Sequence, residues 1–265
     1  MIYSEIHGVP DFEAYELSEK KQKYAVLIPV INEGERIRSE LCRAFEAGVF
    51  EHADIVICDG GSSDGSLNHD FLRSVNVNTL LIKTGSGKQG AQLRMGIWWA
   101  LKLRGYEGII TIDGNNKDSI EDVPNFIDKL KEGYDFVQGS RFVKGGKAIN
   151  TPWLRYISVR LIHAPVISLT AGKWFTDTTN AYRAYSAAYL LDDRTDVFRD
   201  VFISYELLAY LSVRATQIGY RACEIPVTRA YPKGEKTPTK ISFFKGNGGL
   251  MKMLFKNLFR GYNPK

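Results

Sequence analysis

Two oxygen-bearing side chains, Asp113 and Asn115, stand two residues apart in the segment GIITIDGNNKD, directly after an apolar run. This spacing places both oxygens on one side of a turn, which suits Mg²⁺ or Mn²⁺ that also bridges a diphosphate. Turns are also rich in Asp, Gly and Asn because of their backbone geometry, so an ordinary turn is the alternative. Lys117 would neutralise phosphate charge, and Asp118 is either another ligand or the N-cap of a helix expected over residues 121–130.

A second acidic turn, DGGSSDG, follows the apolar run ADIVIC. The Asp59 carboxylate can accept two hydrogen bonds from a uracil or guanine edge or from ribose hydroxyls. The alternative is a polar turn in which Ser62, Ser63 or Asp64 caps the next helix. We expect both features, with Asp59 as the ligand-binding residue and Asp64 as the cap.

Further charged residues could bind anions or transfer protons. The segment TGSGKQG lacks the spacing of a P-loop, so Lys88 either contacts a nucleotide or neutralises a helix start. Arg141 in GSR can hold a phosphate with two hydrogen bonds, with an exposed arginine as the alternative. Asp177 and Arg183 share the Thr-rich segment DTTNAYRAY. Glu206 lies in an otherwise apolar helix and is expected to pair with an arginine or to work in the site.

The elements that must position these residues alternate between strand and helix over residues 24–135. Continuous apolar runs such as YAVLIPVI predict strands covered on both faces, and rows such as Ala91/Met95 and Leu93/Ile97/Leu101 predict helices. This alternation predicts an α/β fold with a mostly parallel central sheet and helices on both faces. The loops NEGE, DGGSSDG and DGNNKD then share the carboxyl edge of the sheet, where ligands of such sheets bind.

Composition limits the class of protein. With 265 residues, 44% hydrophobic residues and a formal charge of +5, the chain is typical of one globular domain. Its three cysteines lack the spacing of a zinc site or disulfide framework, and no run approaches the ~20 apolar residues of a membrane span. We predict a polar N-terminal arm (1–22) that packs late or stays mobile, one domain (23–242) with a regular first half (23–135) and a less regular second half (136–242), and a basic amphipathic tail (243–265).

In this order the segments resemble the family 2 glycosyltransferases of the GT-A fold, particularly the branch of dolichyl-phosphate mannose synthase and bacterial polyprenyl-phosphate glycosyltransferases. LIPVINEGERI is similar to the opening strand of that family, and ICDGGSSDGS is similar to its nucleoside loop. ITIDGNN stands where the family has Asp-X-Asp, and GSRFVKGG, DTTNAYRAY and GYRACEIPV resemble later segments of the branch. The resemblance covers residues 24–242 and implies a nucleotide-sugar half (23–135) and an acceptor half (136–242). The nucleotide-binding residues are then expected to be Pro29, Asn32, Glu33, Asp59, Ser62 and Gly114, together with Lys88 from its own glycine-rich segment.

The resemblance implies an inverting transferase that moves a sugar from a nucleotide-diphosphate sugar to a polyprenyl phosphate or to a cell-envelope glycan or glycolipid precursor. Asp113 and Asn115 would bind the divalent cation, and Arg141 and Arg183 an anionic acceptor or product phosphate. Asn115 replaces the usual second Asp and Lys117 a common Gln, which puts the dependence on metal in question. A lipid-phosphate acceptor needs no general base.

Several alternatives stay open on the sequence. A sugar-hydroxyl acceptor would need a carboxylate base, for which Asp177 and Glu206 are the candidates. The rival functions are a noncatalytic nucleotide-sugar-binding protein and a sugar-nucleotide pyrophosphorylase, although the glycine-rich signature of the latter is missing near the first strand. We predict a cytoplasmic protein without nucleic-acid partners, with its tail either at the cytoplasmic face of a membrane or packed on the body.

Overall fold

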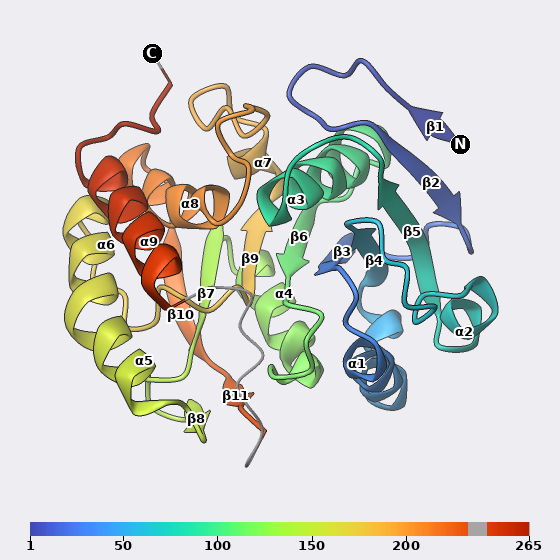
Figure 1. Cartoon of the computed structure of the whole chain (residues 1–265), viewed down its shortest axis with the longest axis horizontal. Coiled ribbons are helices and arrows are strands. Elements are labelled where there is room, and N and C mark those ends of the chain that lie inside the picture. The colour runs from blue at the N-terminus through green and yellow to red at the C-terminus, as the bar shows by residue number, and fades with distance from the viewer. Residues whose placement is uncertain (233–242, 265) are drawn as a thin grey trace.

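A nine-stranded sheet forms the centre of the computed structural model, which describes residues 1–232 and 243–264 (Figure 1). The strand order in this sheet is β1-β2-β5-β4-β3-β6-β9-β7-β10, and β11 and β8 form a second, two-stranded sheet. The strands are β1 Ile2–Tyr3, β2 Phe12–Glu16, β3 Tyr24–Val30, β4 Asp54–Asp59, β5 Val77–Lys83, β6 Gly108–Thr111, β7 Phe136–Ser140, β8 Lys147–Ile149, β9 Arg183–Ser186, β10 Ala222–Pro226 and β11 Thr228–Ala230.

Helices cover both faces of the large sheet. One apolar core lies between the sheet and α3, α6, α8 and α9, and a second lies between the sheet and α1, α2 and α4. The α-helices are α1 Glu35–Glu46, α2 His69–Ser74, α3 Gln89–Ile97, α4 Val123–Lys131, α5 Trp153–Ser158, α6 Ala164–Ala171, α7 Ala187–Leu190, α8 Glu206–Gln217 and α9 Phe243–Leu258. Short 3₁₀ turns at Val49–Glu51 and Ile120–Asp122 and π-helical segments at Trp98–Leu103 and Val159–His163 complete the described helices.

The predicted parallel core is confirmed. Strands β5, β4, β3 and β6 pair in parallel, and Val30 of β3 stands opposite Asp59 of β4. Because both faces of these strands are covered, every residue of β4 and β6 is buried, which explains their continuous apolar runs. The loops that follow β3, β4 and β6 therefore emerge at one edge.

The second half departs from the expected pattern at β9. The residues RAYS, for which the sequence pattern predicts no strand, form a strand that pairs antiparallel with both β6 and β7. Without it, the facing backbone groups of β6 and β7 would lie buried and unpaired, which is costly. Pairing across the sheet decides the conformation of this segment, and sequence periodicity cannot reveal such pairing.

The N-terminal residues, predicted as a polar arm, pack on the edge of the sheet. Strand β2 pairs antiparallel with β5 at the sheet edge, and β1 pairs with β2. Phe12 is fully buried and its ring stacks on Tyr3, with centroids 4.8 Å apart. The free energy of burying this aromatic ring holds the polar segment on the body of the protein.

The C-terminal tail forms helix α9, which contacts α6 and α8. Met253 and Leu254 are buried in the core, whereas Phe255 is 51% and Phe259 is 78% exposed. One side of the helix thus packs on the body, as one of the two alternatives expected. Over the described residues, none of the helices has the length and apolar character needed to cross a membrane.

Candidate active site

The loops after β3 and β4 bind one another through polar side chains. The Asn32 amide nitrogen of the backbone donates to Ser62 Oγ at 2.9 Å, and Asn32 Oδ1 accepts from the Ser63 backbone N–H at 2.8 Å. At the end of β4, the Asp59 carboxylate accepts hydrogen bonds from the Ser62 backbone N–H and hydroxyl. Asn32 has a φ of 48°, a conformation that asparagine tolerates better than most residues. This network orders the turn that is predicted to bind the nucleoside.

The expected capping role of Asp64 is wrong. Asp64 accepts hydrogen bonds from the Gly34 backbone N–H at 2.8 Å and from Ser66, which ties the two loops together. These bonds, that of the Ser66 hydroxyl foremost, lower the pKa of Asp64. The cap of α2 is Asn68, whose Oδ1 accepts from Phe71 N at 2.9 Å.

Three other predicted donor-binding residues lie along the same edge. Pro29 is the penultimate residue of β3, and Glu33 in the following loop accepts from Arg36 Nε at 2.9 Å. Lys88 is exposed directly before α3, where its backbone N–H donates to Ile203 O. These positions surround the Asp59 turn and the start of α3.

The turn after β6 is held in place by close packing at Gly114 and by a hydrogen bond to Glu40. A Cβ atom at Gly114 would lie 2.9 Å from the Val30 side chain, so close packing requires glycine there. Glu40 of α1 is fully buried, and its Oε2 accepts from the Asn116 backbone N–H at 2.7 Å. Asn116 has a φ of 56°, so this hydrogen bond holds the chain in a left-handed conformation that bends the turn.

Glu40→Gln is expected to stabilise the protein increasingly as the pH rises above 4.5. Burial, with Asp118 and Asp113 nearby, raises the pKa of Glu40 well above its ordinary 4.5 even though the Asn116 N–H and Arg43 oppose this. The stability contributed by a raised pKa is complete below pH 4.5 and is lost as the pH rises through the folded-state value. A glutamine amide does not ionise, so the variant keeps this stability at higher pH. Urea unfolding between pH 4.5 and 8 should therefore show a difference in the free energy of unfolding, variant minus wild type, that grows with pH. A difference that does not change with pH would contradict the raised pKa of Glu40.

Asp113, the central predicted residue, is 22% exposed and has partners on three sides. Its Oδ1 accepts from Gln89 Nε2 at 3.1 Å, and its Oδ2 pairs with Arg229 at 3.2 Å. Oδ2 also lies 3.4 Å from the amide nitrogen of Asn115. The turn thus brings together Asp113 and Asn115 as predicted, and adds a guanidinium group that sequence reasoning missed.

The residues present fit a divalent cation with few protein ligands. Asn115 Oδ1 is buried without a hydrogen-bond partner in the described structure, and it shares a turn with the Asp113 carboxylate. Mg²⁺ commonly uses one or two protein oxygens and completes its shell with water and substrate phosphates. Over the described residues there is no group of three or more His, Cys, Asp or Glu side chains that could hold a metal ion alone. A cation bound here would therefore need oxygens of a bound diphosphate or of water to complete its coordination.

Arg229 is the main site residue that the sequence analysis missed. It lies in β11, which runs beside the Asp118 loop: the Ala230 N–H donates to Lys117 O at 2.8 Å, and Asp118 and Arg229 form a β-bridge. Its guanidinium binds the buried Asp118 as well as Asp113. Asp118 is not a helix cap, because the next helical segments are capped at Ser119 and Asp122. Its Oδ2 pairs with Arg229, and its Oδ1 is buried without a hydrogen-bond partner in the described structure.

Arg141 and Asp177 form a buried ion pair instead of acting separately. Arg141 Nε lies 2.6 Å from Asp177 Oδ2 and Nη2 lies 2.9 Å from Oδ1, with side-chain exposures of 1% and 0%. Both carboxylate oxygens are therefore engaged, which leaves Asp177 no free oxygen for the role of base that a sugar-hydroxyl acceptor would require. Arg141 Nη1 is buried without a hydrogen-bond partner in the part of the chain described, so one donor remains for a ligand.

Four cations gather around Tyr231. Lys117 Nζ lies 5.4 Å from the centroid of its ring, and the guanidinium carbons of Arg229 and Arg155 lie at 5.8 and 5.9 Å. Arg155 also donates to the Tyr231 hydroxyl at 3.0 Å. Burial alone would raise the pKa of Tyr231, but Arg229, Arg155 and Arg141 together lower it. Burial and Arg229 lower the pKa of Lys117, so this part of the site favours an anion.

Two predicted residues do not reach this cluster. Arg183 is buried, and its guanidinium donates to Thr178 O at 2.9 Å, to Asn180 O at 2.8 Å and to groups of α8. Its role is to join β9 to α8, which corrects the prediction that it binds phosphate. Glu206 begins α8 rather than lying within it, and accepts from the Ser204 N–H at 2.6 Å. A carboxylate is favourable at that end of a helix, which explains the acid without a catalytic role.

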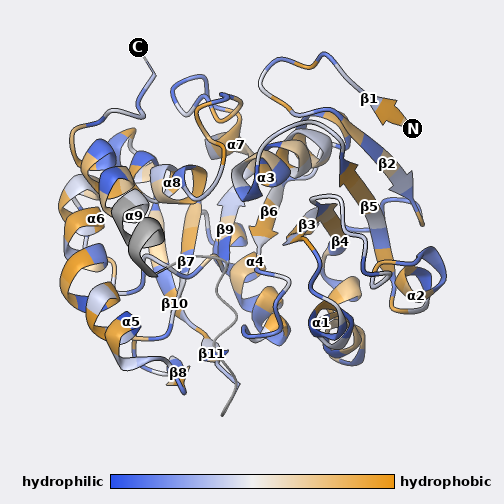
Figure 2. Ribbon diagram, in the orientation of Figure 1, coloured by the Kyte–Doolittle hydropathy of each residue, from blue (hydrophilic) through white to orange (hydrophobic). Residues whose placement is uncertain are grey.

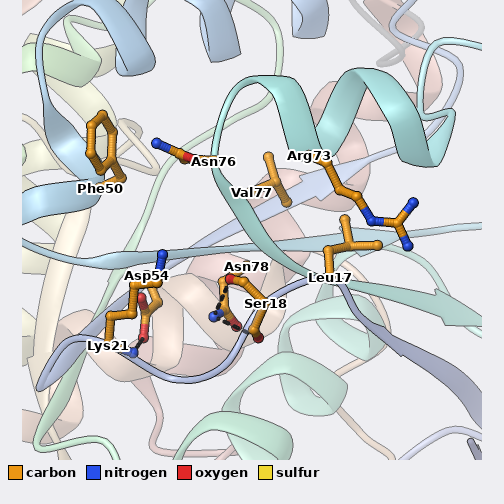
Figure 3. A pocket seen from close by; sticks show the side chains of 9 residues that line it. All are labelled: Leu17, Ser18, Lys21, Phe50, Asp54, Arg73, Asn76, Val77 and Asn78. Atoms are coloured by element: carbon orange, nitrogen blue, oxygen red, sulfur yellow. Dashed lines mark hydrogen bonds between the residues drawn. The ribbon is translucent and has the colours of Figure 1, made fainter.

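A pocket at the opposite edge of the sheet does not belong to this site (Figure 3). It has a volume of about 180 Å³ and lies at the amino ends of β4 and β5, beside Asp54 and Asn78. Asn78 Nδ2 donates to Ser18 and Glu19, and Asp54 Oδ2 accepts from the Lys21 and Gln22 N–H groups. These bonds use the polar groups to attach the N-terminal segment to the sheet.

Solved structures identify the class of fold. The glucosyl-3-phosphoglycerate synthase of Mycobacterium tuberculosis, solved with Mn²⁺, uridine diphosphate and phosphoglyceric acid, matches with a TM-score of 0.61. The match covers 89% of this chain and 77% of that chain at 13% sequence identity, so the likeness concerns the fold. The protein has the GT-A fold of glycosyltransferases.

Relatives in sequence are polyprenyl-phosphate sugar transferases, although no family model matches the chain. The undecaprenyl-phosphate mannosyltransferase of Micrococcus luteus is 31% identical over 206 residues, which is 76% of this chain and 81% of that protein. The polyprenol monophosphomannose synthase of Mycolicibacterium smegmatis is 28% identical over 210 residues, covering 78% and 77%. The chain belongs to the family 2 glycosyltransferases, as the order of its motifs predicts.

Proposed function

We propose that the protein transfers a sugar from a nucleotide-diphosphate sugar to a polyprenyl phosphate with inversion at the anomeric carbon. An oxygen of the acceptor phosphate attacks that carbon and forms the new C–O bond. The bond to the donor diphosphate breaks at the same time, and the nucleoside diphosphate leaves with the electron pair. Because the attacking oxygen is already an anion at neutral pH, no proton has to be removed.

The observation that carries this proposal is the group of cations around Tyr231 beside the Asp113 turn. Arg141 keeps one buried donor without a partner in the described structure, and Lys117 is a buried ammonium group. The aspartates that pair with Arg229 and Arg141 offset the charges of those two groups. Over the described residues Lys117 and Arg155 form no ion pair, and a phosphate would offer them several acceptor oxygens. An acceptor phosphate held here would stand next to the turn proposed to bind the donor diphosphate.

The hydrogen bonds made by Asp177 and Glu206 support a phosphate acceptor over a sugar-hydroxyl acceptor. A hydroxyl acceptor needs a carboxylate that can take its proton. Asp177 gives both oxygens to Arg141, and Glu206 accepts a backbone N–H at the start of α8. Asp177 therefore has no free oxygen to act as a base, and one Glu206 oxygen holds the backbone of its own loop, whereas a phosphate acceptor needs no base.

On the donor side, we propose that Asp59 and Glu33 bind the nucleoside, with Asn32 and Ser62 holding their loops in place. Gln89 and Asn115 flank Asp113 and fix the orientation of its carboxylate. A divalent cation on Asp113 and Asn115 would neutralise charge on the leaving diphosphate. Positioning and charge stabilisation would supply most of the rate enhancement.

An apolar surface next to the cation cluster supports a lipid acceptor. Trp153, Leu161, Leu169 and Trp174 on and beside α5 and α6 are 65% to 75% exposed. Figure 2 shows hydrophobic residues along both helices, and α5 also carries Arg155 of the cluster. Exposed aromatic and aliphatic residues next to basic ones are typical of surfaces that lie in a membrane interface. We propose peripheral membrane contact through this surface, with α9 at its border.

Replacing Trp153 and Leu169 together by serine is expected to weaken binding to vesicles by at least about tenfold, because two large apolar groups would no longer enter the bilayer. Co-sedimentation with vesicles of phosphatidylcholine and phosphatidylglycerol measures this. Leu103→Ser, at a residue that is 41% exposed outside this surface, is the matched control. Equal vesicle binding by all three proteins would refute the proposed membrane surface.

The test of the function is a transfer assay with purified protein. UDP-, GDP- and CDP-linked sugars, radiolabelled in the sugar, would be offered with undecaprenyl phosphate, with a dephosphorylated polyprenol and with Mn²⁺ or chelator. Label that moves only to the phosphorylated lipid supports the proposal. Nucleotide-sugar binding without transfer to either lipid would favour the noncatalytic alternative.

A further inference from the structure

We propose that Arg229 couples metal binding to donor binding: it neutralises Asp113 when no donor is present and moves to the donor diphosphate when a divalent cation takes Asp113. This inference rests on the proposed function and adds a residue that the sequence motifs do not assign. Arg229 would change its anionic partner at the turn after β6 and would act as a positioning residue.

The contacts of Arg229 define two different attachments. Nη1 binds Asp118, whose side chain is fully buried, and also lies 3.3 Å from Asn180 Oδ1. Nη2 lies 3.2 Å from Asp113 Oδ2, on a side chain that is 22% exposed. The first attachment is deep in the fold, and the second lies at the accessible end of the site. The guanidinium can therefore exchange its outer partner while it keeps its inner one.

Charge makes Arg229 and a cation competitors for Asp113. Arg229 Nη2 lies 3.2 Å from Asp113 Oδ2, and a guanidinium group stays charged in proteins. Lys117, also buried, lies over the same Tyr231 ring as Arg229 and adds a second basic group beside it. A divalent ion approaching Asp113 meets this repulsion in a poorly screened environment, where charges a few ångströms apart interact strongly. Metal binding to the free protein should consequently be weak.

A donor diphosphate removes the competition. Its oxygens give Arg229 Nη2 a new anion, which a planar guanidinium binds well, and leave the Asp113 and Asn115 oxygens to the cation. Each ligand then strengthens the binding of the other, and by thermodynamic linkage the two effects are equal. Arg229 thus compensates in part for the neutral Asn115, because cation and diphosphate are retained only together.

Arg229→Gln tests this inference directly. Mn²⁺ binding would be titrated by electron paramagnetic resonance, first with Mn²⁺ alone and then with whichever of UDP, GDP or CDP the wild-type protein binds. The variant is expected to bind Mn²⁺ alone about tenfold more tightly and to lose most of the enhancement that the nucleotide provides. Arg229→Lys keeps the charge and should bind Mn²⁺ alone as weakly as the wild type.

Two further variants separate this effect from a loss of folding. Arg94→Gln also removes a buried arginine that pairs with an aspartate, Asp200, and should leave Mn²⁺ affinity unchanged. If Arg229→Gln alone does not fold, the double variant Arg229→Gln/Asp118→Asn removes the unpaired buried charge and is titrated instead. A nucleotide that binds the wild type, together with unchanged Mn²⁺ affinity in the folded variant, overturns the inference and leaves the proposed function standing. If the wild type binds none of the three nucleotides, both this inference and the proposed function are wrong.

Discussion

Asp113→Ala is expected to reduce sugar transfer by about 1,000-fold, which is the scale for loss of a group that stabilises developing charge. The substitution removes the carboxylate proposed to bind the cation and frees the outer side of Arg229. Arg229 keeps its buried partner Asp118, so the fold should lose little stability. The expected result is therefore a folded protein that is almost inactive.

The measurement is the initial rate of label transfer to undecaprenyl phosphate, with thermal unfolding recorded for the same samples. Asp128→Ala is the matched control, because Asp128 is an exposed acid on α4 that pairs loosely with Lys131. We expect its rate and melting temperature to match those of the wild type. Retention of more than about a tenth of the wild-type rate by Asp113→Ala would argue against a central role for this residue.

Arg141→Gln is expected to destabilise the protein by about 3–5 kcal/mol, since it leaves Asp177 charged and buried without its partner. The pair is almost inaccessible, with side-chain exposures of 1% and 0%, so solvent cannot replace the lost bonds. Urea unfolding at pH 7 measures the free energy of unfolding. A loss below about 1 kcal/mol would mean that water or a rearrangement compensates the aspartate.

The double variant Arg141→Gln/Asp177→Asn separates the two roles of Arg141. Removing both charges leaves two amides that can hydrogen-bond, so most of the stability should return. Transfer to the phosphate acceptor should stay low, because the buried donor proposed for the acceptor is gone. Recovery of both stability and activity would show that Arg141 has only a structural role.

The sequence predicts much of the sheet because its strands are local features. Runs such as YAVLIPVI and ADIVIC are long enough to identify buried parallel strands, and parallel order brings their acidic loops to one edge. Asp59, Asp113 and Asn115 could be placed there on this basis alone. The N-terminal residues and β9 could not, because their strand character comes from hydrogen bonds to distant neighbours.

The partners within the site could not be predicted for the same reason. Asp113 and Arg229 are 116 residues apart, and Arg141 and Asp177 are 36 apart. No local periodicity links such pairs, so the sequence presents Asp177 as a candidate base and does not assign Arg229 to the site. A useful signal was available for Arg229: it follows β10 closely, at the edge where strands of this sheet end.

The antiparallel strand β9 joins what the sequence divides into a donor half and an acceptor half. It pairs with β6 of the first half and with β7 of the second, so one continuous sheet crosses the boundary at residue 135. A fragment ending there would expose an unpaired side of β6 and lose the antiparallel neighbour of that strand. The two halves are therefore not interchangeable modules, and a new acceptor specificity would have to be built within this chain rather than grafted by exchanging its second half.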